Sequence, residues 1–241
     1  MLLFAIKNFK TQIFIKNECP LKSIDVYIFD SIRTFRHNIF SILPYYWKPK
    51  FNNLNYHTFD KYDAQKFNFS LVKPVYFDVP KSNINRYDLC FVGYEKNRGN
   101  KLAEIISEFE SMNMNLYVKV KRSKHAKFNE KLEKYYISEN ISYNQYLLEA
   151  QSSLCFLDIL QDKQLGFTLR VLEALFMDKK LITDNLLISD EPFYHPDNIY
   201  ILGKDEKIRT IQEFLAVPYR EIPNEIKNPY NIVYWIKQFS E

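Results

Sequence analysis

The sequence predicts an α/β protein in which parallel strands alternate with helices. Short apolar runs alternate with amphipathic stretches, most regularly after residue 87. Hydrophobic residues make up 46% of the 241 residues, which is enough for a packed core. The length allows one large domain or two small ones. Because residues 79–87 are polar and contain proline, we expect a boundary there, between domains at 1–80 and 88–241.

The first domain is predicted from the weaker patterns. The apolar run at 24–30 indicates a buried strand. Asp60 can cap a short helix that continues through residue 67. The other elements expected here are strands at 13–15, 56–59 and 71–77, and a helix over 32–47 that ends by Pro44.

The second domain alternates more regularly and is of Rossmann type. Its apolar runs predict five parallel strands, at 88–93, 115–120, 153–159, 181–183 and 199–202. Apolar residues at helical spacing predict helices at 100–112, 142–152, 166–178, 206–215 and 229–239, and residues 123–134 are polar and helix-prone.

The stretch 165–185, LGFTLRVLEALFMDKKLITDN, is the most informative part of the chain. Gly166 is expected to open a helix, and the free N–H groups of a helix N-terminus favour an anion, above all a phosphate. Thr168 and Arg170 face the same loop. Arg170 could neutralise a diphosphate, or it could only pair with Glu173 three residues later. One turn into the helix, Glu173 could accept hydrogen bonds from sugar hydroxyls.

A second candidate site follows the strand at 88–93. In open α/β sheets, ligands bind beyond the carboxyl ends of the strands. Gly93 would let a ligand approach the backbone, and Arg98 could bind a phosphate through two hydrogen bonds. The alternative is a surface loop with a solvated arginine.

Several classes of protein are disfavoured. The four histidines have no metal-binding spacing, and the glycine pattern of dinucleotide-binding proteins is missing, so we expect no metal and no cofactor. The three cysteines show no paired spacing, so we expect no disulfide framework, which is consistent with a protein in a reducing compartment. The net charge of +4 comes without a basic helix interleaved with aromatics, so we expect no nucleic acid partner. The apolar start is too short to span a bilayer and lacks a cleavage site, which indicates a cytoplasmic protein, with peripheral membrane contact as an open alternative.

The stretch 165–185 resembles the nucleotide-sugar segment of B-fold glycosyltransferases. Many retaining members carry Glu, Gly, Phe, a small residue, four mostly apolar residues, Glu-Ala, a helix end and a strand that closes on Thr. The matching residues here are Gly166, Phe167, Glu173, Ala174 and Thr183. The resemblance implies that Glu173 holds the ribose of a nucleotide. The first Glu of the pattern is missing, since Leu165 stands there and Gln164 is adjacent but out of step.

From about Asp25 to its end, the chain resembles a bacterial family of lipopolysaccharide core and surface-polysaccharide glycosyltransferases. The matching segments are 27–31 (YIFDS), 58–68 (TFDKYDAQKFN), 91–93 (FVG), 141–147 (ISYNQYL), 166–173 (GFTLRVLE), 180–185 (KLITDN) and 193–200 (FYHPDNIY). The resemblance implies transfer of a sugar from a nucleotide donor to a lipid-linked oligosaccharide at the inner face of the cytoplasmic membrane. It also implies that the turn at Tyr143 cups the nucleotide base, although an exposed aromatic after a capped helix start is the alternative. The expected donor-binding residues are Gly93, Arg98, Tyr143, Gln164, Gly166, Thr168, Arg170 and Glu173, and no catalytic residue is assigned.

The resemblance also implies a shortened N-terminal half. A B-fold enzyme has two Rossmann halves with the acceptor half first, but only about 80 residues precede the predicted boundary, against roughly 100–200 for a typical domain. The strands at 24–30 and 71–77 would then leave an uncovered sheet edge, so we expect self-association. The alternatives to an active enzyme are a non-catalytic nucleotide- or partner-binding remnant and a purely structural interaction protein.

Overall fold

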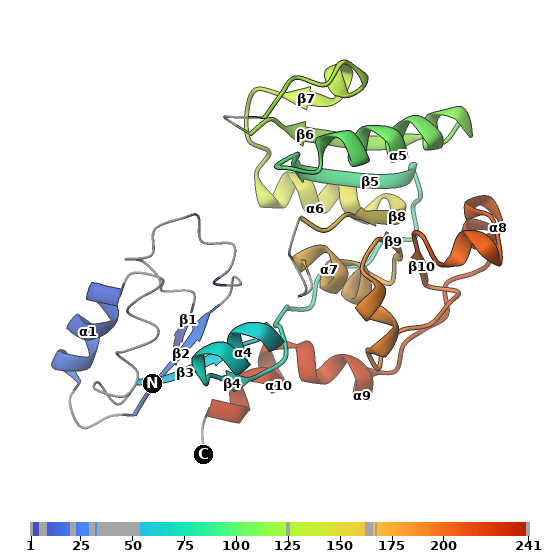
Figure 1. The fold of residues 1–241 in the computed structure, drawn as a ribbon. Helices are drawn as coiled ribbons and strands as arrows, with labels where there is room; N and C mark the ends of the chain where they lie inside the picture. The colour runs from blue at the N-terminus through green and yellow to red at the C-terminus, as the bar shows by residue number, and fades with distance from the viewer. Residues whose placement is uncertain are drawn as a thin grey trace. The chain divides into compact units, whose positions relative to one another are not determined.

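The protein forms two compact units, each built on its own parallel sheet (Figure 1). The computed structural model describes residues 2–4, 9–19, 23–28, 32, 54–123, 126–161, 166 and 168–239. The first unit comprises 1–77, 163–166 and 228–241, and the second comprises 78–162 and 167–227. The chain is therefore an α/β protein with parallel sheets, as its alternation of strands and helices predicts. No helix in the described ranges is long and apolar enough to cross a membrane.

The first unit contains a four-stranded parallel sheet. Its strands lie in the order β1 (Leu2–Phe4), β2 (Ile24–Ile28), β3 (Leu54–Thr58) and β4 (Ser70–Leu71), and its helices include α1 (Phe9–Glu18) and α4 (Lys61–Phe67). The side chains of β2 alternate between the two faces, as expected for a strand. Ile24, Val26 and Ile28 pack with Leu54 and Tyr56 in one buried cluster.

Three expectations for the first unit are wrong. The strand at 24–30 was expected to lie at an uncovered edge, but β2 pairs with β1 on one side and β3 on the other. The strand predicted at 71–77 is reduced to β4, because Pro74 removes a backbone donor and fixes φ. The residues predicted as a strand at 13–15 lie inside α1, where Gln12 is buried and Phe14 is exposed.

The helix after Asp60 is confirmed. Asp60 is the N-cap of α4, and its carboxylate accepts hydrogen bonds from the N–H groups of Tyr62 and Asp63. The helix ends at Asn68, whose φ of 55° is left-handed. The helix predicted over 32–47 lies almost entirely outside the described residues.

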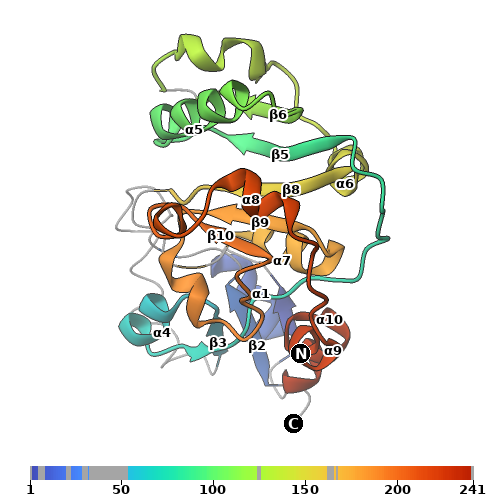
Figure 2. The same ribbon diagram turned by 90° about the vertical axis from the view of Figure 1, so that its right-hand side faces the viewer.

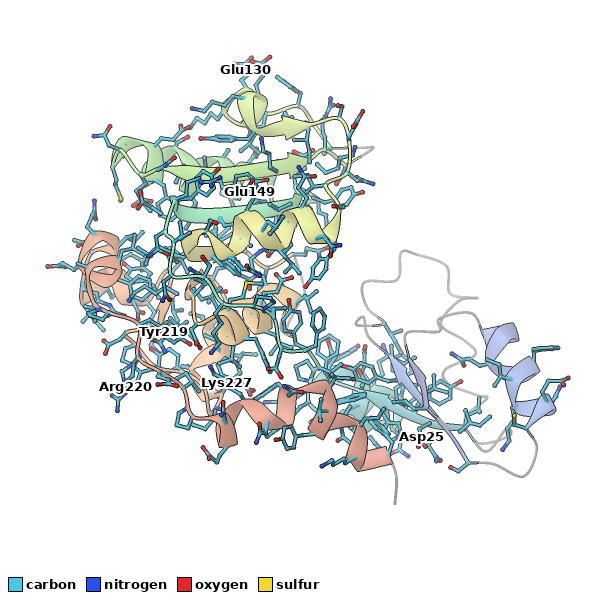
Figure 3. The ribbon with its side chains drawn as sticks, turned by 180° about the vertical axis from the view of Figure 1, so that it is seen from behind. Asp25, Glu130, Glu149, Tyr219, Arg220 and Lys227 are labelled. Carbon is cyan, nitrogen blue, oxygen red and sulfur yellow. The ribbon has the colours of Figure 1, made fainter. Side chains whose placement is uncertain are left out.

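The C-terminal helical segment packs in the first unit, although the predicted second domain, 88–241, included it. It consists of η5 (Asn228–Tyr230), α10 (Ile232–Trp235) and η6 (Ile236–Phe239), in place of the single helix expected over 229–239. The indole of Trp235 donates to the carbonyl of Lys73 at 2.7 Å and meets the Tyr27 ring edge-on at 4.8 Å. Tyr27 lies two residues after Asp25 on β2, where Asp25 is labelled in Figure 3.

The second unit contains a six-stranded sheet in which every pair is parallel. The strands are β5 (Tyr87–Tyr94), β6 (Leu116–Lys121), β7 (Tyr136–Ile137), β8 (Ser153–Asp158), β9 (Lys180–Thr183) and β10 (Ile199–Ile201). They lie in the order β10-β9-β8-β5-β6-β7, and Figure 2 shows β6, β5, β8 and β9 in succession. In chain order this is 3-2-1-4-5-6, the strand order of Rossmann sheets. Five of the six strands were predicted; β7, with only two residues, was missed.

Helices cover both faces of this sheet. The long ones are α5 (Gly99–Ser111), α6 (Tyr143–Gln151) and α7 (Leu169–Met177), and the shorter ones are η2 (Glu130–Tyr135), η3 (Leu186–Asp190), η4 (Asp205–Lys207), α8 (Ile211–Ala216) and α9 (Asn224–Lys227). α5 packs on the strand face that carries Leu89 and Phe91. α6 and α7 are joined to each other through Tyr146 and Glu173. Glu149, labelled on α6 in Figure 3, lies 3.7 Å from Arg86, the residue before β5.

Two predicted helices of the second unit differ in extent. The helix expected over 206–215 is split into η4 and α8, because Thr210 and Glu213 form a capping box that starts a new helix. In the polar stretch 123–134, the described residues, which leave out 124 and 125, form η2 at the end of the stretch.

Candidate anion-binding site

The strands β5 and β8 diverge at their carboxyl ends. The chain leaves β5 for β6 on one side and leaves β8 for β9 on the other. The last residues that pair between β5 and β8 are Cys90 and Phe156, whereas β5 stays paired with β6 as far as Tyr94. Open α/β sheets bind their ligands in the crevice at such a switch point.

Arg170 connects the two diverging strands. It lies in the first turn of α7, and its Nη2 donates to the carbonyl of Val92 on β5 at 2.5 Å. Its Nη1 lies 3.5 Å from Oδ1 of Asp158, the last residue of β8. Asp158 is fully buried and also accepts from the hydroxyls of Thr168, at 2.7 Å, and Thr183, at 3.2 Å. The carboxylate is therefore held in place by two hydroxyls and one guanidinium.

Arg98 lies at the same switch point with far fewer partners. It is the N-cap residue of α5 and is only 9% exposed. Its Nη2 donates to the Tyr94 carbonyl at 3.3 Å, and its buried Nε has no hydrogen-bond partner among the described residues. Burial and the positive charge of Arg170 lower the pKa of Arg98 to about 10, so the side chain is still charged at neutral pH.

Gly93 lies between the two arginines. A Cβ atom at Gly93 would be 3.4 Å from Nη2 of Arg170 and 3.9 Å from Nη2 of Arg98. Both guanidinium groups also lie against the ring of Phe91, at 4.8 Å and 5.5 Å from its centroid. Two cationic groups thus converge beside a backbone position that carries no side chain, an arrangement suited to an anion.

The carboxylate of Glu173 is bound by two tyrosine hydroxyls, which the sequence does not suggest. It is 3% exposed and accepts hydrogen bonds from the hydroxyls of Tyr146, at 2.5 Å, and Tyr143, at 3.1 Å. Burial raises the pKa of this carboxyl group. The surface pair between Arg170 and Glu173 that their spacing suggests is not formed, because Arg170 binds Val92 and Asp158. Glu173 instead joins α6 to α7, and Tyr143 is part of that contact while 39% exposed.

The remaining predicted residues have different positions. Thr168 contributes to the site through Asp158, and it makes no side-chain cap for α7, which starts after Thr168 and not at Gly166. Gly166 belongs to the first unit, where a Cβ atom would lie 2.7 Å from Cε2 of Phe59. Its lack of a side chain is therefore explained by packing. Gln164 lies outside the described residues.

The structure thus brings together Gly93, Arg98, Thr168 and Arg170 at the switch point. Asp158, which organises the site, was missed in the sequence. The available signal was its place at the carboxyl end of a mostly apolar strand, in which it is the only charged residue.

In the part of the chain that the structure describes, no three His, Cys, Asp or Glu side chains are grouped to hold a metal ion. The sequence matches no protein-family model, and it matches no curated protein. Any function must therefore be argued from the geometry of the switch point and from the sequence pattern around α7.

Proposed function

We propose that the chain is a glycosyltransferase whose second unit binds the diphosphate of a nucleotide-sugar donor at the switch point between β5 and β8. The observation that carries the proposal is the convergence of Arg98, Arg170 and Gly93 at the carboxyl edge of a sheet with Rossmann strand order. Guanidinium groups are well matched to phosphate oxygens. A glycine at this point leaves room for the ligand to approach the backbone.

The choice of sugar transfer over other nucleotide chemistry rests on the resemblance of residues 165–185 to B-fold enzymes. That stretch contains α7 and β9, which directly follow the switch point in the chain. By the same resemblance, the acceptor is a lipopolysaccharide or another lipid-linked surface polysaccharide at the cytoplasmic face of the membrane. The first unit is then the acceptor side.

A specific observation favours the alternative of a non-catalytic nucleotide-binding protein. Three buried carboxylates lie near the switch point, those of Glu95, Asp158 and Glu173, and each accepts hydrogen bonds from two protein groups. A general base must reach the proton that it abstracts. None of the three carboxylates is free for that role among the residues described here, so a catalytic base would come from elsewhere.

The two functions are distinguished by binding and turnover measured on the same preparation. The full chain is screened by thermal unfolding against UDP, GDP, ADP and CMP, and the matching nucleotide sugars are then assayed for release of the nucleotide with and without extracted lipopolysaccharide. A ligand at 100 times its Kd stabilises the folded state by about 2.7 kcal/mol. Stabilisation with sugar transfer supports the enzyme, and stabilisation without turnover supports the remnant. If none of the nucleotides stabilises the chain, both the transferase and the nucleotide-binding alternative are contradicted.

A further inference from the structure

We propose that the two arginines have different roles, and that Arg98 binds the phosphate whereas Arg170 is a positioning residue that fixes the diverging ends of β5 and β8. This inference rests on the proposed function, since it assigns roles within the same site. The sequence alone treats the two side chains as equivalent. Their surroundings in the structure are not equivalent.

Both terminal nitrogens of Arg170 already contact protein partners. Its carbonyl acceptor, Val92, lies beyond Cys90, the last β5 residue that pairs with β8. Its carboxylate partner, Asp158, is completely buried. Arg170 therefore replaces the missing ladder contacts between β5 and β8, and its charge is balanced by Asp158. A phosphate bound by Arg170 would have to compete with both of these contacts.

Arg98 has neither of these compensations. The structure shows no carboxylate in ion-pair contact with its guanidinium in the described ranges, and the hydrogen bond of its side chain there is a 3.3 Å contact with the Tyr94 carbonyl. Its Nε is buried and unpartnered among the described residues, as is the Nε of Arg170, so the two side chains differ in the partners of their terminal nitrogens. A guanidinium that is nine-tenths buried without a counter-ion is unfavourable. A ligand that supplies negative charge and two acceptor oxygens would remove this cost.

The ligand class follows from the chemistry of the Arg98 guanidinium, which lies beside Gly93. A Cβ atom at Gly93 would make ordinary contacts with Nη2 of Arg170, the Phe91 ring and Nη2 of Arg98, at 3.4, 3.8 and 3.9 Å. We expect a phosphate group at the Arg98 guanidinium to accept two parallel hydrogen bonds from it. The shared chemistry is that of a diphosphate, which either inorganic pyrophosphate or a nucleoside diphosphate could provide.

The test compares variants of the full chain by calorimetric titration with inorganic pyrophosphate, a nucleoside diphosphate and the bare nucleoside. Arg98→Gln should weaken pyrophosphate binding by about tenfold or more, the loss expected for a hydrogen bond to a charged group. Without ligand, the same variant should unfold at the same temperature as the wild-type chain or higher. Gly93→Ala should weaken pyrophosphate binding while keeping both charges. Arg86→Gln, an exposed arginine before β5, is the matched control and should change neither quantity.

Arg170→Gln should show the opposite pattern, with a lower unfolding temperature in the absence of ligand. Arg170→Lys keeps the charge but lacks the planar guanidinium with its two parallel donors, so it should restore only part of that stability. The Lys variant replaces the Gln variant in this comparison if the Gln variant does not fold. In a double-mutant cycle, Arg170→Lys and Asp158→Asn should be strongly non-additive in stability.

Three results would overturn the assignment. These are wild-type affinity for pyrophosphate in Arg98→Gln, a loss of unliganded stability in Arg98→Gln as large as that in Arg170→Gln, and no binding of pyrophosphate or nucleoside diphosphate to the wild-type chain. The proposed function fails separately. If pyrophosphate binds through Arg98 but no nucleotide sugar is turned over, the assignment stands and the transferase does not. If a nucleotide sugar is turned over equally well by Arg98→Gln, the transferase stands and the assignment does not.

Discussion

The contact between Glu173 and Tyr146 gives the most quantitative prediction for the second unit. Both side chains are buried, at 3% and 8% exposure, and the hydroxyl lies 2.5 Å from Oε2 of Glu173. A hydrogen bond to a charged group contributes about 1.5–3 kcal/mol. Tyr146→Phe removes only the hydroxyl, so we expect it to lower the free energy of unfolding by about 2 kcal/mol. Tyr143→Phe is the internal control, because its bond is 3.1 Å long and the ring is 39% exposed, and it should cost clearly less.

A double-mutant cycle isolates this contact. Tyr146→Phe, Glu173→Gln and the double variant are unfolded in urea and followed by circular dichroism, with hydrogen exchange of the α6 amides reporting on the second unit alone. We expect a coupling energy of about 1–2 kcal/mol between the two sites. Additive losses, or equal losses for Tyr143→Phe and Tyr146→Phe, would refute the account of Glu173 as the link between α6 and α7.

The same carboxylate predicts a dependence on pH. Burial raises the pKa of Glu173 above its ordinary value of 4.5. The folded state then binds a proton more tightly than the unfolded state, so stability from this group is present below pH 4.5 and is lost as pH rises through the folded pKa. Relative to the wild-type chain, Glu173→Gln should therefore gain stability from about pH 4 to pH 7. A difference that is constant over that range would show that Glu173 titrates normally.

Two further predictions concern other parts of the fold. Gly166→Ala should destabilise the first unit by about 1–3 kcal/mol, because its Cβ would lie 2.7 Å from the ring of Phe59. The indole fluorescence of Trp235 in that unit provides the readout. An unchanged midpoint of unfolding would contradict this packing. Lys180 donates to the carbonyls of Asp197 and Phe214, and burial lowers its pKa from 10.5 to about 8. The unfolded state therefore binds more protons between those values, so the wild-type chain should gain stability relative to Lys180→Met as pH rises through that window, and a parallel pH profile for the two proteins would count against it.

The elements of the fold that were predictable depend on local chemistry. Asp60 caps α4 through its own neighbouring amides, and the strands of the second unit carry continuous apolar runs, so both can be recognised in the sequence. Elements that depend on tertiary contacts could not be recognised in the sequence. β7 is only two residues long and exists through its pairing with β6.

The candidate site shows the same division. Gly93 and Arg98 follow a predictable strand, so their position at a carboxyl edge could be inferred. The partners of Arg170 could not be inferred, because sequence spacing suggests Glu173 at i+3. The actual partners are Asp158, at the end of the preceding strand, and Val92, 78 residues away. The engagement of Glu173 with two tyrosines of α6 is likewise a tertiary contact.

The central claim is that a diphosphate binds at the switch point of the second sheet through Arg98. The most direct measurement is a crystal structure of the full chain with a nucleoside diphosphate. We predict phosphate oxygens within hydrogen-bond distance of the Arg98 guanidinium and beside Gly93, with the contacts from Arg170 to Val92 and Asp158 unchanged. Phosphates held by Arg170 with its Asp158 contact broken, or bound away from the carboxyl ends of β5 and β8, would contradict it.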